Sequence, residues 1–209
     1  MNKKNYQLVL DKELKELEHA ERRPRLLLHA CCAPCSSYVL EYLSEYFDIT
    51  ALYYNPNIWP ESEYEKRYGE LRRLCSEMGL PGVAVTDTGY DENEFLSAVE
   101  GLENEREGGA RCEKCFILRL FKTAEICARD GYDFFTTTLS ISPHKNAELL
   151  NKTGEAAAEK YGCRYLHGDF KKRGGFDRSL ALSEQYRLYR QDYCGCRFSK
   201  AESGSGWQG

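Results

Sequence analysis

Seven of the ten cysteines in this 209-residue chain fall into three short groups, and thiols grouped in this way can bind a metal or exchange electrons. The N-terminus is charged and lacks the apolar core of a signal peptide, so we expect a cytoplasmic protein. Structural disulfides are rare in that reducing compartment, which favours metal ligation or redox catalysis. The groups are Cys31, Cys32 and Cys35 in HACCAPC, Cys112 and Cys115 in RCEKC, and Cys194 and Cys196 in YCGC.

The first two groups together offer enough thiols for one tetrathiolate site. The C-x2-C spacing of RCEKC, at the start of an expected helix, lets two thiolates face one metal, and HACCAPC supplies further ligands. Such a site could hold zinc or an iron–sulfur cluster. We favour iron–sulfur, because seven thiols exceed what one structural zinc needs. The other three cysteines, Cys75, Cys127 and Cys163, are expected to be small buried hydrophobic residues.

The YCGC group indicates a different chemistry. A disulfide between Cys194 and Cys196 would close a small strained ring and would be easily reduced. The pair could therefore relay electrons, or it could add two more metal ligands.

Five short segments rich in apolar or β-branched residues, each followed by a helical pattern or a polar loop, predict the fold. The first, at residues 26–28, is a continuous apolar run of the kind found in a central parallel strand. We expect an α/β fold with an open, parallel, five-stranded, Rossmann-like sheet and helices on both of its faces. The other four strands are expected near residues 49–54, 83–86, 134–138 and 163–166.

Domain organisation and charge narrow the possible functions. We expect residues 1–24 to form a helical extension, residues 25–200 a single catalytic domain, and residues 201–209 a flexible tail. The formal charge of −4 argues against a protein that coats nucleic acid non-specifically. No segment has the roughly 20 apolar residues that a membrane span requires, so we expect no membrane partner.

Ligands bind at the carboxyl ends of parallel strands, so the loops after the expected strands should converge on one rim. Asp87 and His144 lie in two of these loops and are candidates for proton transfer, although His144 could instead contact a phosphate. Lys171, Lys172 and Arg173 form a basic run that could contact a phosphate or an RNA backbone, while many such runs are only solvated surface.

Several aromatic residues surround the loop after the second expected strand. Tyr53, Tyr54, Trp59 and Tyr64 could stack on an unpaired base. Aromatic residues at strand or helical spacing more often belong to the core, so both interpretations stay open.

Six motifs together resemble one known family, the epoxyqueuosine reductases of the QueH type, over about residues 25–199. They are LLLHACCAPCS, YYNPNI, RCEKCFILRL, TTTLSISPHKN, KKRGGFDRSLALS and LYRQDYCGCRFS. The resemblance implies a HUP-type nucleotide-binding fold and a cobalamin-independent oxidoreductase. Its substrate would be epoxyqueuosine at the wobble position of a tRNA anticodon loop, from which it would remove the epoxide oxygen to give queuosine and water.

The resemblance also implies a set of site residues. Cys31, Cys32, Cys112 and Cys115 would hold a [4Fe–4S] cluster, accompanied by an adjacent mononuclear iron, and Cys35 is a further candidate metal ligand. Cys194 and Cys196 would be the redox-active pair. An external low-potential electron donor would be needed, and Asp87 or His144 would protonate the epoxide oxygen. The expected substrate contacts are Tyr53, Asn55, Lys145, Lys171, Lys172 and Arg173.

Two other functions are compatible with the same residues. A structural or regulatory zinc protein would use the thiols without turnover and would be colourless. An ATP-using tRNA-modifying enzyme of the PP-loop type would share the sheet, but the HACCAPC loop lacks the glycine-rich phosphate cradle that ATP requires.

Overall fold

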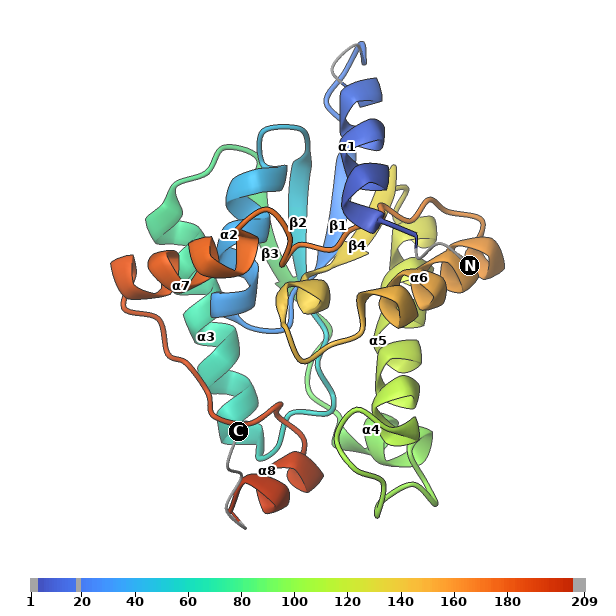
Figure 1. The fold of residues 1–209 in the computed structure, drawn as a ribbon, viewed down its shortest axis with the longest axis vertical. Helices are drawn as coiled ribbons and strands as arrows, with labels where there is room; N and C mark the ends of the chain where they lie inside the picture. The colour runs from blue at the N-terminus through green and yellow to red at the C-terminus, as the bar shows by residue number, and fades with distance from the viewer. Residues whose placement is uncertain (1–3, 18–19, 205–209) are drawn as a thin grey trace.

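Four parallel strands form the sheet at the centre of the molecule (Figure 1). The computed structural model describes residues 4–17 and 20–204. The strands lie in the order β3-β2-β1-β4, so β1 is central and has a neighbour on each side. Their bounds are β1 Arg25–His29, β2 Asp48–Tyr53, β3 Val83–Asp87 and β4 Phe134–Thr137.

Helices cover both faces of this sheet. They are α1 Tyr6–Leu17, α2 Ala33–Leu43, α3 Glu61–Met78, α4 Glu92–Ala98, α5 Ala110–Arg129, α6 Ala147–Tyr161, α7 Gly175–Gln185 and α8 Arg197–Gly204, with a short 3-10 helix η1, Thr138–Ile141. Within the described ranges, no helix is both long and apolar enough to cross a bilayer.

The apolar run of β1 explains the two layers, because successive side chains of a strand point to opposite faces. Leu26 and Leu28 pack in one core with α1 and α2, whereas Leu27 packs in a second core with α5 and α6. All three leucines are fully buried, as expected of a central parallel strand. Helices α2 and α3 therefore lie on the opposite side of the sheet from α5, and α7 packs on α2 (Figure 1).

The expected fifth strand is wrong: the sheet has four strands. Tyr165 forms only an isolated parallel bridge with Phe135 beside β4. The backbone after this bridge bonds to side chains, which ends the ladder. The Thr136 hydroxyl donates to Leu166 O at 2.8 Å, and the Asn151 amide group bonds both N and O of Gly168 at 3.0 and 2.9 Å.

The C-terminal segment also differs from expectation. Helix α7 ends at Gln185, and Arg187 adopts a φ of 49°. The extended segment that follows carries Tyr193 and Cys194 toward the loop after β2. Helix α8 then runs to Gly204, into the segment predicted to be a tail, and residues 205–209 lie outside the described residues.

Candidate functional site

The first thiol group lies at the carboxyl ends of β1 and β4, where the chain leaves these two neighbouring strands in opposite directions. Connections from two adjacent parallel strands diverge there, which opens a crevice at the carboxyl end of the sheet. Hydrogen bonds join its two sides: Cys31 N donates to Thr138 Oγ1 at 3.1 Å, and the Thr138 hydroxyl donates to Cys31 Sγ at 3.3 Å. The crevice is therefore built around Cys31.

Cys31, Cys32 and Cys35 form a compact group in which the three sulfur atoms lie within 4.8 Å of one another. Cys35 sits in the first turn of α2, whose N-cap is Cys32, with Pro34 at a position where a missing N–H does no harm. Hydrogen bonds from Cys32 and Cys35, together with the charge of Arg119, hold the pKa of Cys31 well below its ordinary value. The hydrogen bond to Cys31 raises the pKa of Cys32 to about 12. Cys31 is thus the most acidic thiol of the group.

The other two thiol groups face the crevice from different elements. Cys112 and Cys115 lie one turn apart at the start of α5, and Gly108 N donates to Cys112 Sγ at 3.2 Å. Cys196 is buried just before α8, where its sulfur accepts a hydrogen bond from Ser199 N at 3.3 Å. Burial raises the pKa of Cys115 to about 12 and that of Cys196 above its ordinary value.

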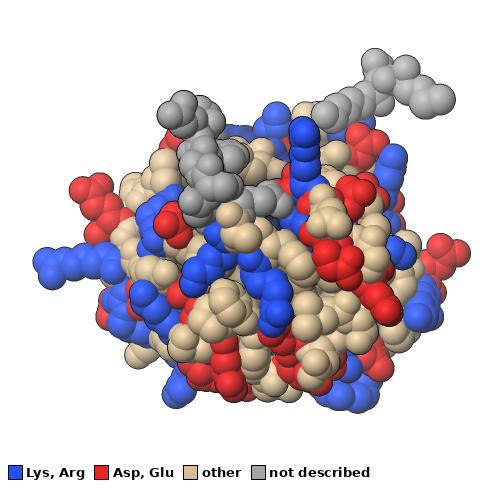
Figure 2. All heavy atoms as spheres, turned by 90° about the horizontal axis from the view of Figure 1, so that it is seen from below, with Lys and Arg blue, Asp and Glu red and all other residues tan. Residues whose placement is uncertain are grey.

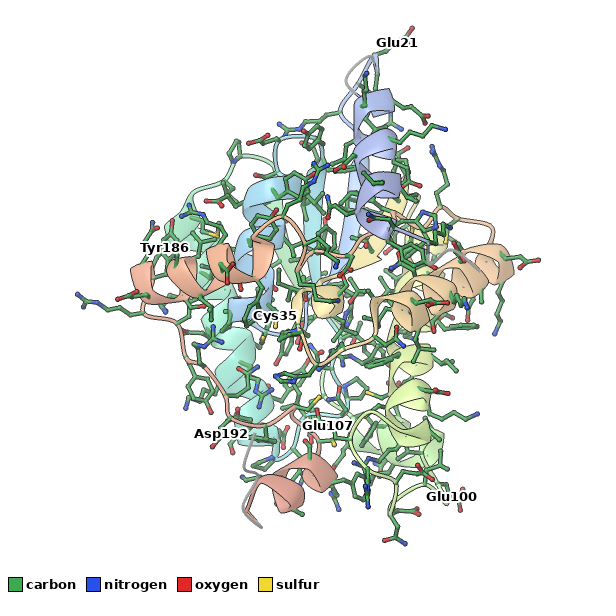
Figure 3. All side chains as sticks on the ribbon, viewed as in Figure 1. Glu21, Cys35, Glu100, Glu107, Tyr186 and Asp192 are labelled. Carbon is green, nitrogen blue, oxygen red and sulfur yellow. The ribbon has the colours of Figure 1, made fainter. Side chains whose placement is uncertain are left out.

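Two adjoining cavities bring all seven thiols together. The larger, of about 510 Å³, is lined by Cys31, Cys32, Cys35 and Cys194. The smaller, of about 30 Å³, is lined by Cys112, Cys115, Cys194 and Cys196. In Figure 3, Cys35 on α2, Glu107 before α5 and Asp192 before α8 lie around the larger cavity, below the sheet. Cys194 borders both cavities.

Three cationic side chains are placed among these thiols. The Arg119 side chain lies within 3.9 Å of Cys115 Sγ, and the Lys145 ammonium lies 3.6 Å from Cys194 Sγ. Arg67 is 2% exposed and donates to Cys194 O at 3.3 Å. Burial alone would lower the pKa of Arg119, but the neighbouring sulfur atoms of Cys115 and Cys31 raise the pKa of Arg119 above its ordinary value. The cavity therefore favours an anionic occupant on its thiol side.

A buried hydrogen-bond network fixes Arg119. Its guanidinium donates to Asn55 Oδ1, and its Nε donates to His29 Nε2 at 3.2 Å. The Nδ1 atom of His29 lies 2.8 Å from Thr137 Oγ1, and its Nε2 atom also lies 3.1 Å from Tyr54 O. Burial, and next the Arg119 charge, lower the pKa of His29 to about 3, which favours a neutral ring.

The loop after β2 holds the YCGC segment against the cavity. Trp59 N donates to Gly195 O at 2.8 Å. A Cβ atom on Gly195 would lie 3.1 Å from Arg67 Nη1 and 3.5 Å from Asn57 Nδ2, and the backbone there has a φ of +131°. Glycine is thus required at this position by both the close approach and the backbone conformation.

Of the residues predicted for proton transfer and substrate contact, His144 and Lys145 line both cavities. Asp87 is exposed at the end of the edge strand β3 and is not among the described residues that line either cavity. Its side chain hydrogen bonds to Tyr68 instead.

The other predicted substrate contacts lie outside the cavity wall. Tyr53 is fully buried and packs on Tyr64 with ring centroids 4.9 Å apart, which is the core arrangement considered above. Asn55 is fully buried, and its side-chain oxygen accepts a hydrogen bond from Arg119.

The predicted basic run is paired with acids near α1 and η1. Lys171 lies 2.6 Å from Asp169 and Arg173 lies 2.5 Å from Asp11, while Lys172 is exposed. Among the described residues that line the two cavities, none belongs to this run.

Sequence reasoning missed Arg67, Arg119 and Asn57. Arginines in amphipathic helices usually face solvent, so neither helix pattern drew attention to them. The pattern that could have found Arg119 is its place four residues after Cys115 and one before the buried Leu120, on the apolar face of α5. Arg67 likewise lies three residues after Tyr64 and four before Leu71.

The surface around the crevice mixes both charges. Figure 2 views the molecule from the end that carries α8 and shows lysine and arginine side chains crossing the middle of this face among acidic ones. Near Trp59, Arg197 and Lys200 lie 5.5 and 5.3 Å from its ring centroid. A nucleic acid would therefore find a few placed cations here rather than a uniformly basic surface.

A family model and several named relatives all match this chain to the same protein family. The family model described as epoxyqueuosine reductase QueH matches residues 26–202. A Streptococcus pyogenes serotype M1 protein named epoxyqueuosine reductase QueH is 42% identical over 203 residues, which cover 96% of this chain and 80% of that protein. A protein of the same name from Thermotoga maritima is 35% identical over 178 residues, covering 85% and 91% of the two chains.

A solved structure shares the fold. The U34-tRNA thiolase NcsA from Methanococcus maripaludis, solved with its [4Fe-4S] cluster, matches with a TM-score of 0.53 and 14% identity. The match covers 92% of this chain and 69% of that one. At this identity the likeness concerns the α/β architecture alone.

Proposed function

Because the chain belongs to the QueH family of epoxyqueuosine reductases, we propose that it reduces epoxyqueuosine to queuosine at the wobble position of tRNA, without cobalamin and with a [4Fe–4S] cluster. One observation supports this most strongly. Seven thiols from three parts of the chain line adjoining cavities at the carboxyl end of the sheet, with three cationic side chains among them.

The donor set fits an iron–sulfur cluster. Four cysteine thiolates are the usual ligands of a [4Fe–4S] cluster, and the assembly carries net negative charge that Arg119, Arg67 and Lys145 would offset. We assign the ligands to Cys31, Cys32, Cys112 and Cys115. Cys31 and Cys112 pack against the same apolar cluster of Phe116, Leu120 and Leu139, which supports their pairing. Cys35, within 4.8 Å of Cys31 and Cys32, is left as a ligand for an adjacent iron.

When bound, the cluster would supply electrons one at a time, whereas removal of an epoxide oxygen consumes two electrons and two protons. Cys194 and Cys196 balance this requirement. Their oxidation from two thiols to a disulfide releases two electrons and two protons, and the products are the alkene of queuosine and water. Both cysteines are free thiols in the structure, and an external low-potential donor must reduce the disulfide after each turnover.

We assign the protonation of the departing oxygen to Lys145 and His144, because both residues line the two cavities. Lys145 is partly buried, and its proximity to Cys194 raises the pKa of Lys145 above its ordinary value, so its ammonium stays charged and can donate a hydrogen bond to the oxygen as it departs. His144 lies at the exposed mouth of the same cavity and can exchange protons with solvent.

The test starts with protein purified without oxygen, whose iron, sulfide and visible spectrum are measured before and after dithionite. We expect a brown protein with about four irons per cluster that bleaches on reduction. It should convert epoxyqueuosine in tRNA to queuosine, detected by mass spectrometry of the nucleosides. A colourless protein that contains only zinc and gives no conversion would contradict the proposal and favour a structural zinc site.

A further inference from the structure

One wall of the larger cavity carries three polar atoms without a hydrogen-bond partner in the part of the chain that the structure describes. They are Nη2 of Arg67, Oδ1 of Asn57 and Oε1 of Gln191. Arg67 and Asn57 are each 2% exposed, so bulk solvent does not reach these side chains freely. Buried polar atoms are nearly always paired in folded proteins, and three orphans on one cavity wall point to a ligand.

Other polar atoms of Arg67 and Gln191 already have hydrogen-bond partners. Arg67 Nε donates to Glu63 at 2.7 Å, and its Nη1 donates to Cys194 O at 3.3 Å, leaving Nη2. The Gln191 amide donates to Cys32, leaving its oxygen. Asn57 Nδ2 and Arg67 Nη1 both approach Gly195, so the two side chains are neighbours.

The wall therefore offers one donor beside two acceptors. A phosphate has acceptors only, so it would pair with Arg67 and leave both amide oxygens facing negative charge. The Watson–Crick edge of guanine has the complementary pattern, because the O6 acceptor adjoins the N1–H and N2–H donors. Queuosine is a 7-deazaguanine nucleoside, which keeps this edge and carries its modification on the five-membered ring.

Building on the proposed function, we propose that Arg67, Asn57 and Gln191 bind the guanine-type edge of the wobble base after it is flipped out of the anticodon loop. The cavity volume of about 510 Å³ suits a modified nucleobase. With the edge held on this wall, the ring substituent on the opposite side of the base points into the rest of the cavity, which Cys31, Cys32, Cys35 and Cys194 help to line. The modified residue is thereby recognised through the part of the base that the modification leaves unchanged.

The experiment compares two RNA anticodon stem-loops, one with guanine and one with hypoxanthine at the wobble position. Hypoxanthine lacks only the exocyclic amine, so one acceptor on the wall would stay unpaired. We expect the wild-type holoprotein to bind the hypoxanthine stem-loop about tenfold more weakly at fixed salt. In Asn57→Leu or Gln191→Leu this ratio should fall toward one.

The controls separate folding from recognition. Gln185→Leu, at the exposed end of α7, should keep the wild-type ratio. The base change in the RNA needs no protein variant, so misfolding cannot imitate it. Equal binding of the two stem-loops by the wild type, or binding of neither, overturns the inference. The inference is also overturned if inorganic phosphate competes with the stem-loops and the Arg67→Gln substitution abolishes this competition.

The outcomes also distinguish this inference from the proposed function. Turnover of epoxyqueuosine tRNA together with equal binding of the stem-loops would refute the base-edge contact alone. Guanine preference without turnover would refute the reductase activity and leave the contact standing.

Discussion

Nζ of Lys145 lies 3.6 Å from Sγ of Cys194, and both side chains line the two cavities. This contact joins the loop before α6 to the C-terminal cysteine pair, and it places a positive charge beside Cys194.

Lys145→Met should therefore lower kcat for epoxide reduction by about 100-fold, because the departing oxygen loses its charged donor. Lys145→Arg should recover part of the rate. The measurement is single-turnover conversion of epoxyqueuosine tRNA. Lys152→Met, which removes an exposed lysine paired with Glu148, is the matched control and should keep the full rate.

Removal of a proposed ligand should change the iron content. Cys32→Ala and Cys112→Ala should each lose most of the iron and the brown colour, whereas Cys35→Ala should keep the cluster and lose at most one iron. Cys75→Ala, on the far part of α3, should keep all of it. Full iron retention in Cys32→Ala and Cys112→Ala would contradict the ligand assignment.

Arg119→Met should make the cluster harder to reduce, because a buried positive charge near Cys115 favours the more negative reduced state. The midpoint potential, followed by electron paramagnetic resonance, should become more negative. The variant also removes the Arg119 donor from Asn55 Oδ1 and from His29 Nε2, and it should lose about 3 kcal/mol of stability. Arg119→Lys keeps the charge and should restore the potential more than the stability.

Gly195→Ala should abolish turnover while the protein stays folded. The added methyl would meet Arg67 and Ile58 at 3.1 Å, and the φ of +131° is strained for any other residue, so Cys194 and Cys196 must move. Gly79→Ala is the control: its φ is +57° but its surroundings are open, so it should cost about 1 kcal/mol and leave activity intact. Equal activity of the two variants would count against a fixed YCGC geometry.

Stability should depend on pH through His167, which lies 2.9 Å from Glu13 on α1 and 2.8 Å from Glu155 on α6. The hydrogen bond to Glu13, aided by Glu155 and opposed by burial, raises the pKa of His167 above its ordinary value. A group with a raised pKa stabilises the fold while protonated. Its contribution is complete below the ordinary pKa of about 6.5 and is lost as the pH rises through the folded value.

The comparison is urea unfolding of the wild type and of His167→Phe at pH 6 and pH 9. The variant should be less stable by about 1–3 kcal/mol at pH 6 and nearly equal at pH 9. His144→Gln serves as the control. An undiminished difference at pH 9 would show that packing on Tyr6, not charge, carries the effect.

The thiol groups could be predicted because their chemistry is local in the sequence. Two cysteines one helical turn apart, or cysteines at the end of an apolar strand, indicate a metal or redox site whatever packs around them. The parallel pattern of the strands also predicted that the loops would meet at one rim. The prediction of a fifth strand was wrong because the side chains of Thr136 and Asn151 bond to the backbone groups that this strand would use. No residue pattern in the sequence indicates that side chains will compete for these groups.

The cationic half of the site could not be predicted in the same way. Arg67 and Arg119 look like ordinary helix surface until the thiols that they face are folded against them. Tyr53 shows the opposite case, since its position beside a rim loop indicated a substrate contact, yet the packing of Tyr64 encloses it. Burial of a polar group is a property of the assembled structure.

The dependence of the cavity on residues 190–199 has a consequence during protein synthesis. This segment follows the sheet and the HACCAPC and RCEKC loops in sequence, and it docks on the loop after β2 through Trp59 and Gly195. During synthesis the thiol crevice can therefore form before the segment that carries Cys194 and Cys196 reaches it. Until that segment docks, the crevice stays open on the side that these two cysteines later cover.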